Sequence, residues 1–263
     1  MSAVTLPAPA ARPNVIANTL TIARRNLLHI KANPELLVEM SIQPIMFLGL
    51  FVYVFGGAIA DSSREYLQFA LPGILVQAIC FTPFATALGL NVDFQRGLID
   101  RFRSLPMARS AVIGGRITAD GVRITWSVLL MTAVGVALGF RFQNGAAGAL
   151  GAFAIVIAFG LALCWPMAYV GIVSRTTESV NTLGFMLILP LTFASSAFVP
   201  VETMPGWLQA FAEVNPVTQV IDAARGLMLG GPVAEPVIAS IAWMVAIVAV
   251  FAPLAILRYR RRT

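Results

Sequence analysis

Long apolar runs separated by short polar links make up most of this 263-residue chain. An α-helix needs about 20 mainly apolar residues to cross the hydrocarbon core of a bilayer. The apolar positions are continuous rather than alternating, which favours helical spans over the strands of a membrane barrel. We therefore predict an all-α integral membrane protein in which residues 34–258 form one domain with six transmembrane helices. The expected spans are residues 36–60, 66–90, 117–140, 146–174, 179–198 and 236–257.

The region before the first span divides into two parts. Residues 1–13 are rich in Ala and Pro and lack the basic and apolar regions of a signal peptide, so we expect a disordered cytoplasmic tail. Within residues 14–33, Ile16, Leu20 and Ala23 fall on one helical face and polar residues fall on the other. This spacing predicts an amphipathic helix that lies in the cytoplasmic membrane interface.

Four charged residues flank the junction between this helix and the first span. Arg24 and Arg25 belong to the amphipathic helix, and Glu35 and Glu39 lie one turn apart where the span begins. Opposite charges on neighbouring helical turns attract each other, so we expect these interfacial residues to pair within the chain. Contact of the two carboxylates with a basic partner surface is the alternative.

Only 11% of the residues are charged, and many of them gather between the second and third predicted spans. Nine charged residues lie between positions 91 and 123. Placing all of them at mid-bilayer would cost about 25 kcal/mol, so most must reach water. Residues 91–116 are therefore expected to form a cytoplasmic loop suited to docking another protein, with a plain topogenic loop as the alternative. Arg116, Asp120 and Arg123 should form a self-neutralising stripe where the third span begins.

Residues 199–235 are too interrupted by Pro and Gly to form a span, yet too apolar for a free loop. Irregular backbone survives at membrane depth only where protein or a water-filled cavity covers it. We therefore predict two short re-entrant helices that dip into the outer leaflet between the fifth and sixth spans. Their aromatic residues Trp207 and Phe211 should then be covered by protein.

The distribution of basic residues predicts the orientation. With six spans and both termini in the cytoplasm, fifteen of the eighteen Lys and Arg residues lie inside, and only Arg64, Arg141 and Arg225 lie outside. Such an excess of basic residues in cytoplasmic segments is typical of multi-pass proteins, and we predict the cell inner membrane as the location. Residues 259–263 then form a basic cytoplasmic tail.

The sequence offers no catalytic or energy-supplying group. Its only lysine, Lys31, is followed by Ala-Asn, so the phosphate-binding sequence GxxxxGK[ST] is absent. Its only histidine is His29, and Cys80 and Cys164 stand alone in apolar runs, which argues against a metal or catalytic cluster. The predicted spans hold no ionisable residue near their centres, which argues against an ion relay. We expect neither enzymatic activity nor a bound cofactor.

The polar residues within the spans are few and uncharged. A path with such a lining suits an apolar or amphipathic substrate, and the energy to move it must come from another polypeptide. A membrane-anchoring or assembly protein without transport activity is the alternative. The polar residues concerned are Gln43, Gln68, Gln77, Thr132, Asn181, Thr182, Thr192, Ser195 and Ser196.

Two regions of the sequence resemble one known family. Residues 102–109, Phe-Arg-Ser-Leu-Pro-Met-Ala-Arg, followed by residues 115–120, resemble the cytoplasmic loop of type-2 ATP-binding-cassette (ABC) exporter permeases. Residues 198–209, 215–218 and 224–231 are similar to the outer segment of the same family, and the daunorubicin-resistance permease-like group is the nearest branch.

The resemblance implies a six-helix permease that works as a dimer, with an identical or homologous second copy, beside two ATPase subunits that bind ATP and magnesium. The cargo would be a drug, lipid or glycolipid. The loop around Leu105 and Pro106 would touch the ATPase, with Phe102, Leu105 and Met107 as apolar anchors. The complete predicted docking set is Asp100, Arg101, Phe102, Arg103, Leu105, Pro106 and Met107. The predicted outer gate consists of Phe198, Trp207 and Phe211.

Overall fold

The computed structural model describes residue 24 and residues 34–56, 62–96 and 109–262. Secondary structure in these ranges is helical throughout, which confirms the predicted all-α class for the described part of the chain. The elements are α2 (Pro34–Leu50), the π-helix η1 (Phe51–Phe55), α4 (Ser63–Phe81), α5 (Phe84–Gln95), α7 (Arg109–Ala137), α8 (Gly145–Val173), α9 (Thr177–Phe193), the short 3-10 helix η2 (Val201–Thr203), α10 (Gly206–Val214), α11 (Pro216–Leu229) and α12 (Ala234–Arg262).

Within the described ranges, four helical stretches are long and apolar enough to cross a membrane, and they coincide with the second, third, fourth and sixth predicted spans. The first and fifth predicted spans fall on α2 with η1 and on the 17-residue α9, so both stay predictions. The four stretches are Ser63–Gln95, Gly114–Ala137, Gly145–Val173 and Ala234–Tyr259, and a shorter apolar helix covers Ile42–Val54.

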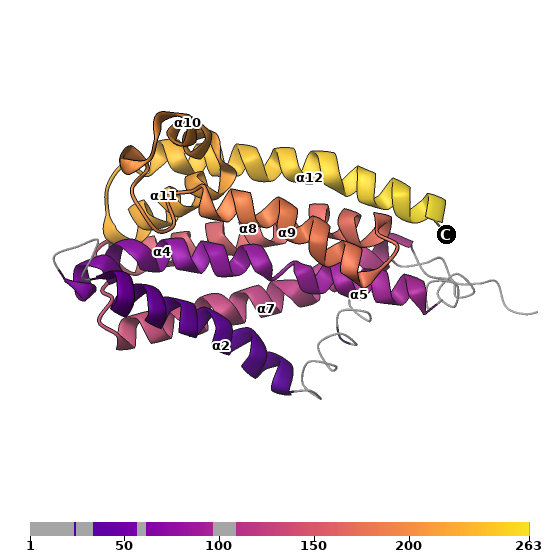
Figure 1. Ribbon diagram of the computed structural model, residues 1–263, viewed down its shortest axis with the longest axis horizontal. Coiled ribbons are helices and arrows are strands. Elements are labelled where there is room, and N and C mark those ends of the chain that lie inside the picture. Colours follow the sequence, from indigo (N-terminus) through magenta and orange to yellow (C-terminus); the bar gives the residue numbers. More distant parts are fainter. Residues whose placement is uncertain (1–23, 25–33, 57–61, 97–108, 263) are drawn as a thin grey trace, which may run out of the picture.

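The long helices lie side by side along one axis of the molecule (Figure 1). α8 packs against α5, α7, α11 and α12, which places it inside the bundle. The beginning of α4 and the short helices α10 and α11 lie at one end, and the C-terminal end of α12 lies at the other (Figure 1). The bundle therefore has two distinct ends, one with the short helices and one with the C-terminus.

Polar side chains cap the N-termini of α4 and α11, two helices at the end of the bundle that holds the short helices. The Ser62 hydroxyl accepts a hydrogen bond from the backbone N–H of Glu65 at 3.2 Å before α4. The Asn215 amide oxygen accepts from the N–H of Val217 at 2.9 Å before α11. Each cap satisfies a donor that the first helical turn leaves unpaired, and Pro216 at the first helical position loses no bond.

Glycine allows close backbone approach in the core. A Cβ atom at Gly171 of α8 would collide with the carbonyl oxygen of Ala87 in α5. A Cβ at Gly73 of α4 would collide with the backbone of Ala197, just after α9. Small residues of this kind bring membrane helices into direct contact, so α4 is held firmly against the segment that follows α9.

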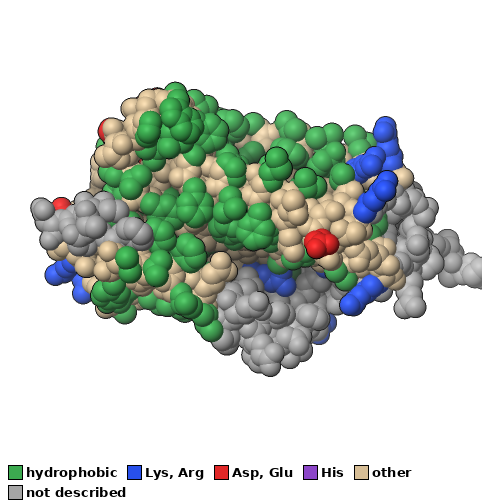
Figure 2. Space-filling view, viewed as in Figure 1, with side chains coloured by type: hydrophobic (Ala, Val, Ile, Leu, Met, Phe, Trp, Pro, Cys, Tyr) green, Lys and Arg blue, Asp and Glu red, His purple; other side chains and the backbone are tan. Residues whose placement is uncertain are grey.

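The surface is largely apolar along the bundle, and basic side chains gather where α12 ends (Figure 2). Met186 of α9 is 74% exposed, and large apolar residues of α2 and α12 are also exposed. An outward apolar surface on this scale fits lipid or another protein chain rather than water.

Candidate functional site

The predicted docking residues fall outside the described part of the chain. This applies to Asp100, Arg101, Phe102, Arg103, Leu105, Pro106 and Met107. The flanking helices are described, and α5 runs to Gln95 while α7 begins at Arg109. Both ends of the predicted 91–116 loop are therefore helical, because residues there continue the two membrane helices.

An ionic cluster links these two helices. Arg116 Nη2 of α7 lies 3.2 Å from Asp93 Oδ2 of α5, and Arg123 Nη1 donates to Asp120 Oδ1 at 2.7 Å within α7. Asp120 has no exposed surface. The Asp120–Arg123 pair of the predicted stripe is thus present, and Arg116 also forms an ion pair across to Asp93 of α5. Gly89 leaves room for this, because a Cβ there would collide with the guanidinium.

Two amides fasten the end of α5 to the end of α8. Asn91 Nδ2 donates to the carbonyl oxygens of Gly171 at 3.2 Å and Ser174 at 2.8 Å. Gln95 Nε2 donates to Asn91 Oδ1 at 2.7 Å and to the carbonyl of Arg175 at 3.3 Å. This clamp could not be found from the sequence, because its backbone acceptors lie about 80 positions away from the two amides. The helix that leads into the predicted docking loop is therefore attached to the central helix of the bundle.

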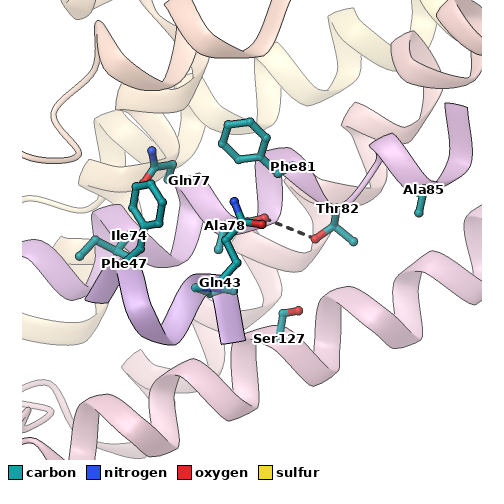
Figure 3. Close-up of a pocket in the computed structure, with 10 residues that line it drawn as sticks. Gln43, Phe47, Ile74, Gln77, Ala78, Phe81, Thr82, Ala85 and Ser127 are labelled. Carbon is teal, nitrogen blue, oxygen red and sulfur yellow. Dashed lines mark hydrogen bonds between the residues drawn. The ribbon is translucent and has the colours of Figure 1, made fainter. Parts of the chain in front are cut away.

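A pocket of about 170 Å³ lies between α2, α4, α5 and α7. Gln43 and Phe47 line it from α2, Gln77 and Phe81 from α4, and Ser127 from α7 (Figure 3). Gln77 lies two positions from residue 79, the midpoint of the candidate membrane-spanning stretch Ser63–Gln95, so the pocket lies near the middle of that stretch. The other lining residues are Pro44, Ile74, Ala78, Thr82 and Ala85.

Two polar residues that line this pocket have little exposed surface. Gln77 is 4% exposed and Ser127 is 7% exposed. Thr82, which also lines the pocket, donates from Oγ1 to the carbonyl oxygen of Ala78 at 3.4 Å (Figure 3). The pocket therefore combines uncharged polar side chains with apolar walls.

Aromatic rings continue from the pocket toward the end that holds α10 and α11. The ring centroids of Phe47 and Phe51 lie 5.7 Å apart. Phe51, in the π-helix η1, stacks on Phe198 at 4.3 Å, and Phe198 lies 5.6 Å from Phe193. π-Helical turns in longer helices often occur at functional sites. The sequence-predicted gate residue Phe198 is thus connected to the pocket by a line of rings.

A second group of rings includes Phe81, another residue that lines the pocket. Phe81 and Phe84 lie 6.0 Å apart, and Phe185 of α9 lies 5.0 Å from Phe84 and 6.1 Å from Phe81. This group contacts the pocket through Phe81, which lines it. Two groups of aromatic rings therefore contact the pocket, one through Phe47 and one through Phe81.

The outer segment is fastened to the bundle by Arg225 of α11. Its guanidinium donates to Asp222 Oδ1 at 2.9 Å, to the carbonyl of Ser196 at 2.9 Å and to the carbonyl of Phe69 at 3.3 Å. It also lies 4.0 Å over the Phe69 ring. Burial raises the pKa of Asp222, and the Ser196 hydroxyl and the Arg225 charge oppose that rise. This outer lock, formed by Phe69, Ser196, Asp222 and Arg225, joins α11 to α4 and to the turn after α9.

The three predicted gate residues lie in different surroundings. Phe198 is buried in the line of rings and accepts a hydrogen bond at its carbonyl from the Tyr66 hydroxyl at 3.2 Å. Trp207 is 76% exposed and Phe211 is 45% exposed, both on α10. Apolar side chains cover the surface over α10 (Figure 2). The prediction that Trp207 and Phe211 are covered is wrong within one chain, because α10 turns these rings outward.

The predicted interfacial pairing stays a prediction. Arg24 is exposed, and Arg25 lies outside the described residues. Glu35 and Glu39 lie in α2, of which only the helical backbone is described at these positions.

Comparison with known proteins defines the class. Residues 17–229 match the ABC-2 type transporter family. The chain is 38% identical over 252 residues to a daunorubicin resistance ABC transporter permease of Streptomyces coeruleorubidus, covering 96% of this chain and 89% of the relative. It is 30% identical over 248 residues to a probable doxorubicin resistance ABC transporter permease of Mycobacterium tuberculosis, covering 94% and 89% of the two chains.

The chain belongs to the ABC-2 type transporter family, as its resemblance to that family had predicted. With its apolar helices, it is a multi-pass membrane permease of an ABC transporter. The relatives are permeases, which agrees with the expectation that this chain is not itself an enzyme.

Proposed function

We propose that this chain is the membrane subunit of an ATP-driven exporter that moves a hydrophobic or amphipathic substrate, such as a drug, lipid or glycolipid. The substrate would leave the cytoplasm or the inner leaflet. The observation that carries the proposal is the pocket near the middle of the stretch Ser63–Gln95, which has apolar walls and uncharged polar groups. The sequence contains no phosphate-binding loop, so a separate ATPase, with its ATP and magnesium, would supply the energy.

The proposed orientation places both termini in the cytoplasm and the protein in the cell inner membrane. It is supported by the fifteen basic residues that the six-span arrangement places inside. The arrangement of the bundle also supports it, because α10 and α11 lie at the end opposite the C-terminus (Figure 1). In this orientation α2 with η1 and α9 are the two remaining spans, and residues 199–235 form the outer re-entrant segment. Residues 1–13 and 259–263 would be cytoplasmic tails, with the interfacial helix at residues 14–33.

We further propose that the ATPase docks on the loop between α5 and α7. The clamp from Asn91 and Gln95 to α8 supports this role, because movement of the loop is then passed directly to the centre of the bundle. A second permease copy would cover part of the exposed apolar surface of α9 and α10. Phe198, Trp207 and Phe211 would then form the outer gate.

Purification of the chain with its ATPase tests this function. We expect the complex to hydrolyse ATP and to do so faster when doxorubicin is added, as a probe suggested by the relatives' names. The control is the same ATPase without the permease, whose rate should not respond to the drug. A stable complex whose hydrolysis responds neither to doxorubicin nor to a panel of drugs, lipids and glycolipids would favour an anchoring or assembly role instead.

A further inference from the structure

We propose that a second pocket, at the outer end of the bundle, binds the phosphate group of an anionic phospholipid. This outer pocket lies between η1, the start of α4 and the end of α7, and its volume is about 400 Å³. It lies at the end of the bundle where α4 begins (Figure 1) and shares no lining residue with the pocket described above. Its occupant would be a lipid of the outer leaflet rather than exported cargo, so the inference uses the proposed orientation only to name the leaflet.

Two arginine side chains meet at the outer pocket from distant parts of the sequence. Arg64 lies in the first turn of α4, and Arg141 follows the end of α7. A Cβ atom at Gly139 would lie 3.8 Å from Arg64 Nε, so the Arg64 side chain extends close to the backbone two positions before Arg141. With Arg225, these are the three basic residues that the predicted topology places outside. Arg225 belongs to the outer lock, whereas Arg64 and Arg141 converge on one pocket.

Neither of these guanidinium groups has a counter-charge among the described residues. The ion pairs there join Arg116, Arg123 and Arg225 to aspartates. No acidic residue lines the outer pocket in the described part of the chain, and Glu65, next to Arg64 in sequence, is exposed away from it. Two cations that line one pocket repel each other, and an anion between them removes this repulsion. A phosphate suits this place, because it can accept hydrogen bonds from both guanidinium groups.

The position of Arg141 is fixed by contacts within the chain. Its Nη1 donates to the carbonyl oxygens of Val136 at 3.1 Å and Phe140 at 3.0 Å, at the C-terminal end of α7. The Gln68 amide of α4 accepts from the Arg141 N–H at 2.9 Å and donates to its carbonyl oxygen at 3.1 Å. Gly139, with a φ of +112°, allows the turn between α7 and Arg141. Groups that are already held in place lose little conformational entropy when a ligand binds.

The start of α4 adds a partial positive charge. Ser63, the first residue of this helix, lines the outer pocket. The first backbone N–H groups of a helix have no partner within it, and with the helix dipole they favour an anion. The Ser62 side chain accepts from one of them, the N–H of Glu65. A phosphate in the outer pocket would therefore interact with the helix N-terminus as well as with both arginines.

The apolar walls of the outer pocket indicate a lipid rather than free phosphate. Val52 and Leu138 line it, and so does Tyr53, which is 69% exposed. Val54, the next residue of η1, is 59% exposed, so an outward apolar surface continues from the pocket. Tyrosine and arginine at the ends of membrane spans typically lie at the level of the lipid headgroups. A lipid would thus place its phosphate on the arginines and an acyl chain along Tyr53 and Val54.

Photo-crosslinking of the full chain in lipid nanodiscs tests the site. The probe is phosphatidylglycerol with a diazirine near the headgroup end of one acyl chain, in a phosphatidylcholine bilayer, and mass spectrometry identifies the labelled peptides. We expect saturable labelling of η1 and of the end of α7. Arg64→Gln and Arg141→Gln should each raise the probe fraction needed for half-maximal labelling by about fivefold, since one arginine near an anionic surface contributes about 1 kcal/mol. The control Arg175→Gln, which removes an exposed arginine at the opposite end of the bundle, should leave it unchanged.

Thermal unfolding and competing anions complete the test. Arg64 is exposed, so Arg64→Gln should unfold at the same temperature as the unaltered chain in phosphatidylcholine alone. Added phosphatidylglycerol should then raise the unfolding temperature of the unaltered chain more than that of the variant. Unchanged labelling in Arg64→Gln would overturn the site, and so would equal labelling by a phosphatidylcholine probe, because negative charge would then not be selected. Displacement of the probe by inorganic phosphate at the same concentration would overturn a lipid as the occupant.

Discussion

Replacing Arg225 with methionine should release the outer segment from the bundle. The guanidinium makes charge-assisted hydrogen bonds to Asp222, Ser196 and Phe69 and lies over the Phe69 ring. Methionine keeps much of the apolar volume but makes none of these contacts. Removing one partner of a buried ion pair typically costs about 3–5 kcal/mol, because the other partner stays behind uncompensated, but this pair is only partly buried, since the Asp222 side chain is 37% exposed. We expect a cost near the lower end, since Asp222 keeps the hydrogen bond from the Ser196 hydroxyl.

Hydrogen exchange followed by mass spectrometry measures this cost locally. A cost of about 3 kcal/mol corresponds to roughly a hundredfold loss of amide protection in α11 if the segment opens as a unit. α8, which packs against α11 inside the bundle, should lose much less protection. Arg64→Met at the exposed start of α4 is the matched control and should leave α11 unchanged. Unaltered protection of α11 in Arg225→Met would refute the outer lock.

The same variant has a predicted pH dependence. Burial raises the pKa of Asp222, so its charged form opposes folding and its neutral form is favoured in the folded state. Without Arg225 that pKa rises further, since a nearby positive charge is lost. The destabilisation of Arg225→Met should therefore be smaller in acid, where Asp222 is protonated, and grow as the pH rises through its folded-state pKa. An effect that grows on acidification would contradict this sign.

Three further substitutions test the predicted docking loop and the helices that flank it. Asp120→Asn leaves the partly buried Arg123 without its counter-charge, so we expect a loss of about 3 kcal/mol, the lower end of the range for buried pairs, seen as a lower unfolding temperature in detergent. Asn91→Ala removes both bonds to α8, so the stimulation of ATP hydrolysis by cargo should fall while ATPase binding persists. Leu105→Asp should abolish co-purification of the ATPase while the permease still inserts and folds, because a charge replaces a predicted apolar anchor.

Each of these predictions has its own contradicting result. Unchanged stability of Asp120→Asn would mean that Arg123 finds another partner. The control is Glu178→Gln, which replaces an exposed carboxylate and should leave the stability unchanged. Full coupling in Asn91→Ala would show that the clamp does not transmit movement. Normal retention and coupling of the ATPase by Leu105→Asp would exclude the docking assignment.

Features that depend on local composition could be read from the sequence. The apolar runs predicted the four long stretches correctly, because a run of that length has no other stable arrangement in lipid. The pairing of Asp120 with Arg123 was also predictable, since residues three apart on a helix are neighbours.

Features that depend on partners distant in the sequence could not be predicted from it. Arg225 was counted only as an outside basic residue, because the carbonyl of Phe69 lies 156 positions away in sequence. Gln43 and Gln77 were noted as polar residues in spans, but only the packing of α2 on α4 and α7 brings them to one pocket. The apolar character of Trp207 and Phe211 is visible in the sequence, yet it cannot distinguish a protein cover from lipid or a second chain.

Transport by vesicles that contain the chain and its ATPase tests the central claim most directly. Doxorubicin movement across the vesicle membrane is followed with ATP, with an ATPase variant lacking its phosphate-binding lysine, and with a proton or sodium gradient alone. We predict movement only with ATP and the active ATPase, because this chain has neither a phosphate-binding loop nor a chain of ionisable groups through its described spans. Movement driven by an ion gradient without ATP would contradict the account.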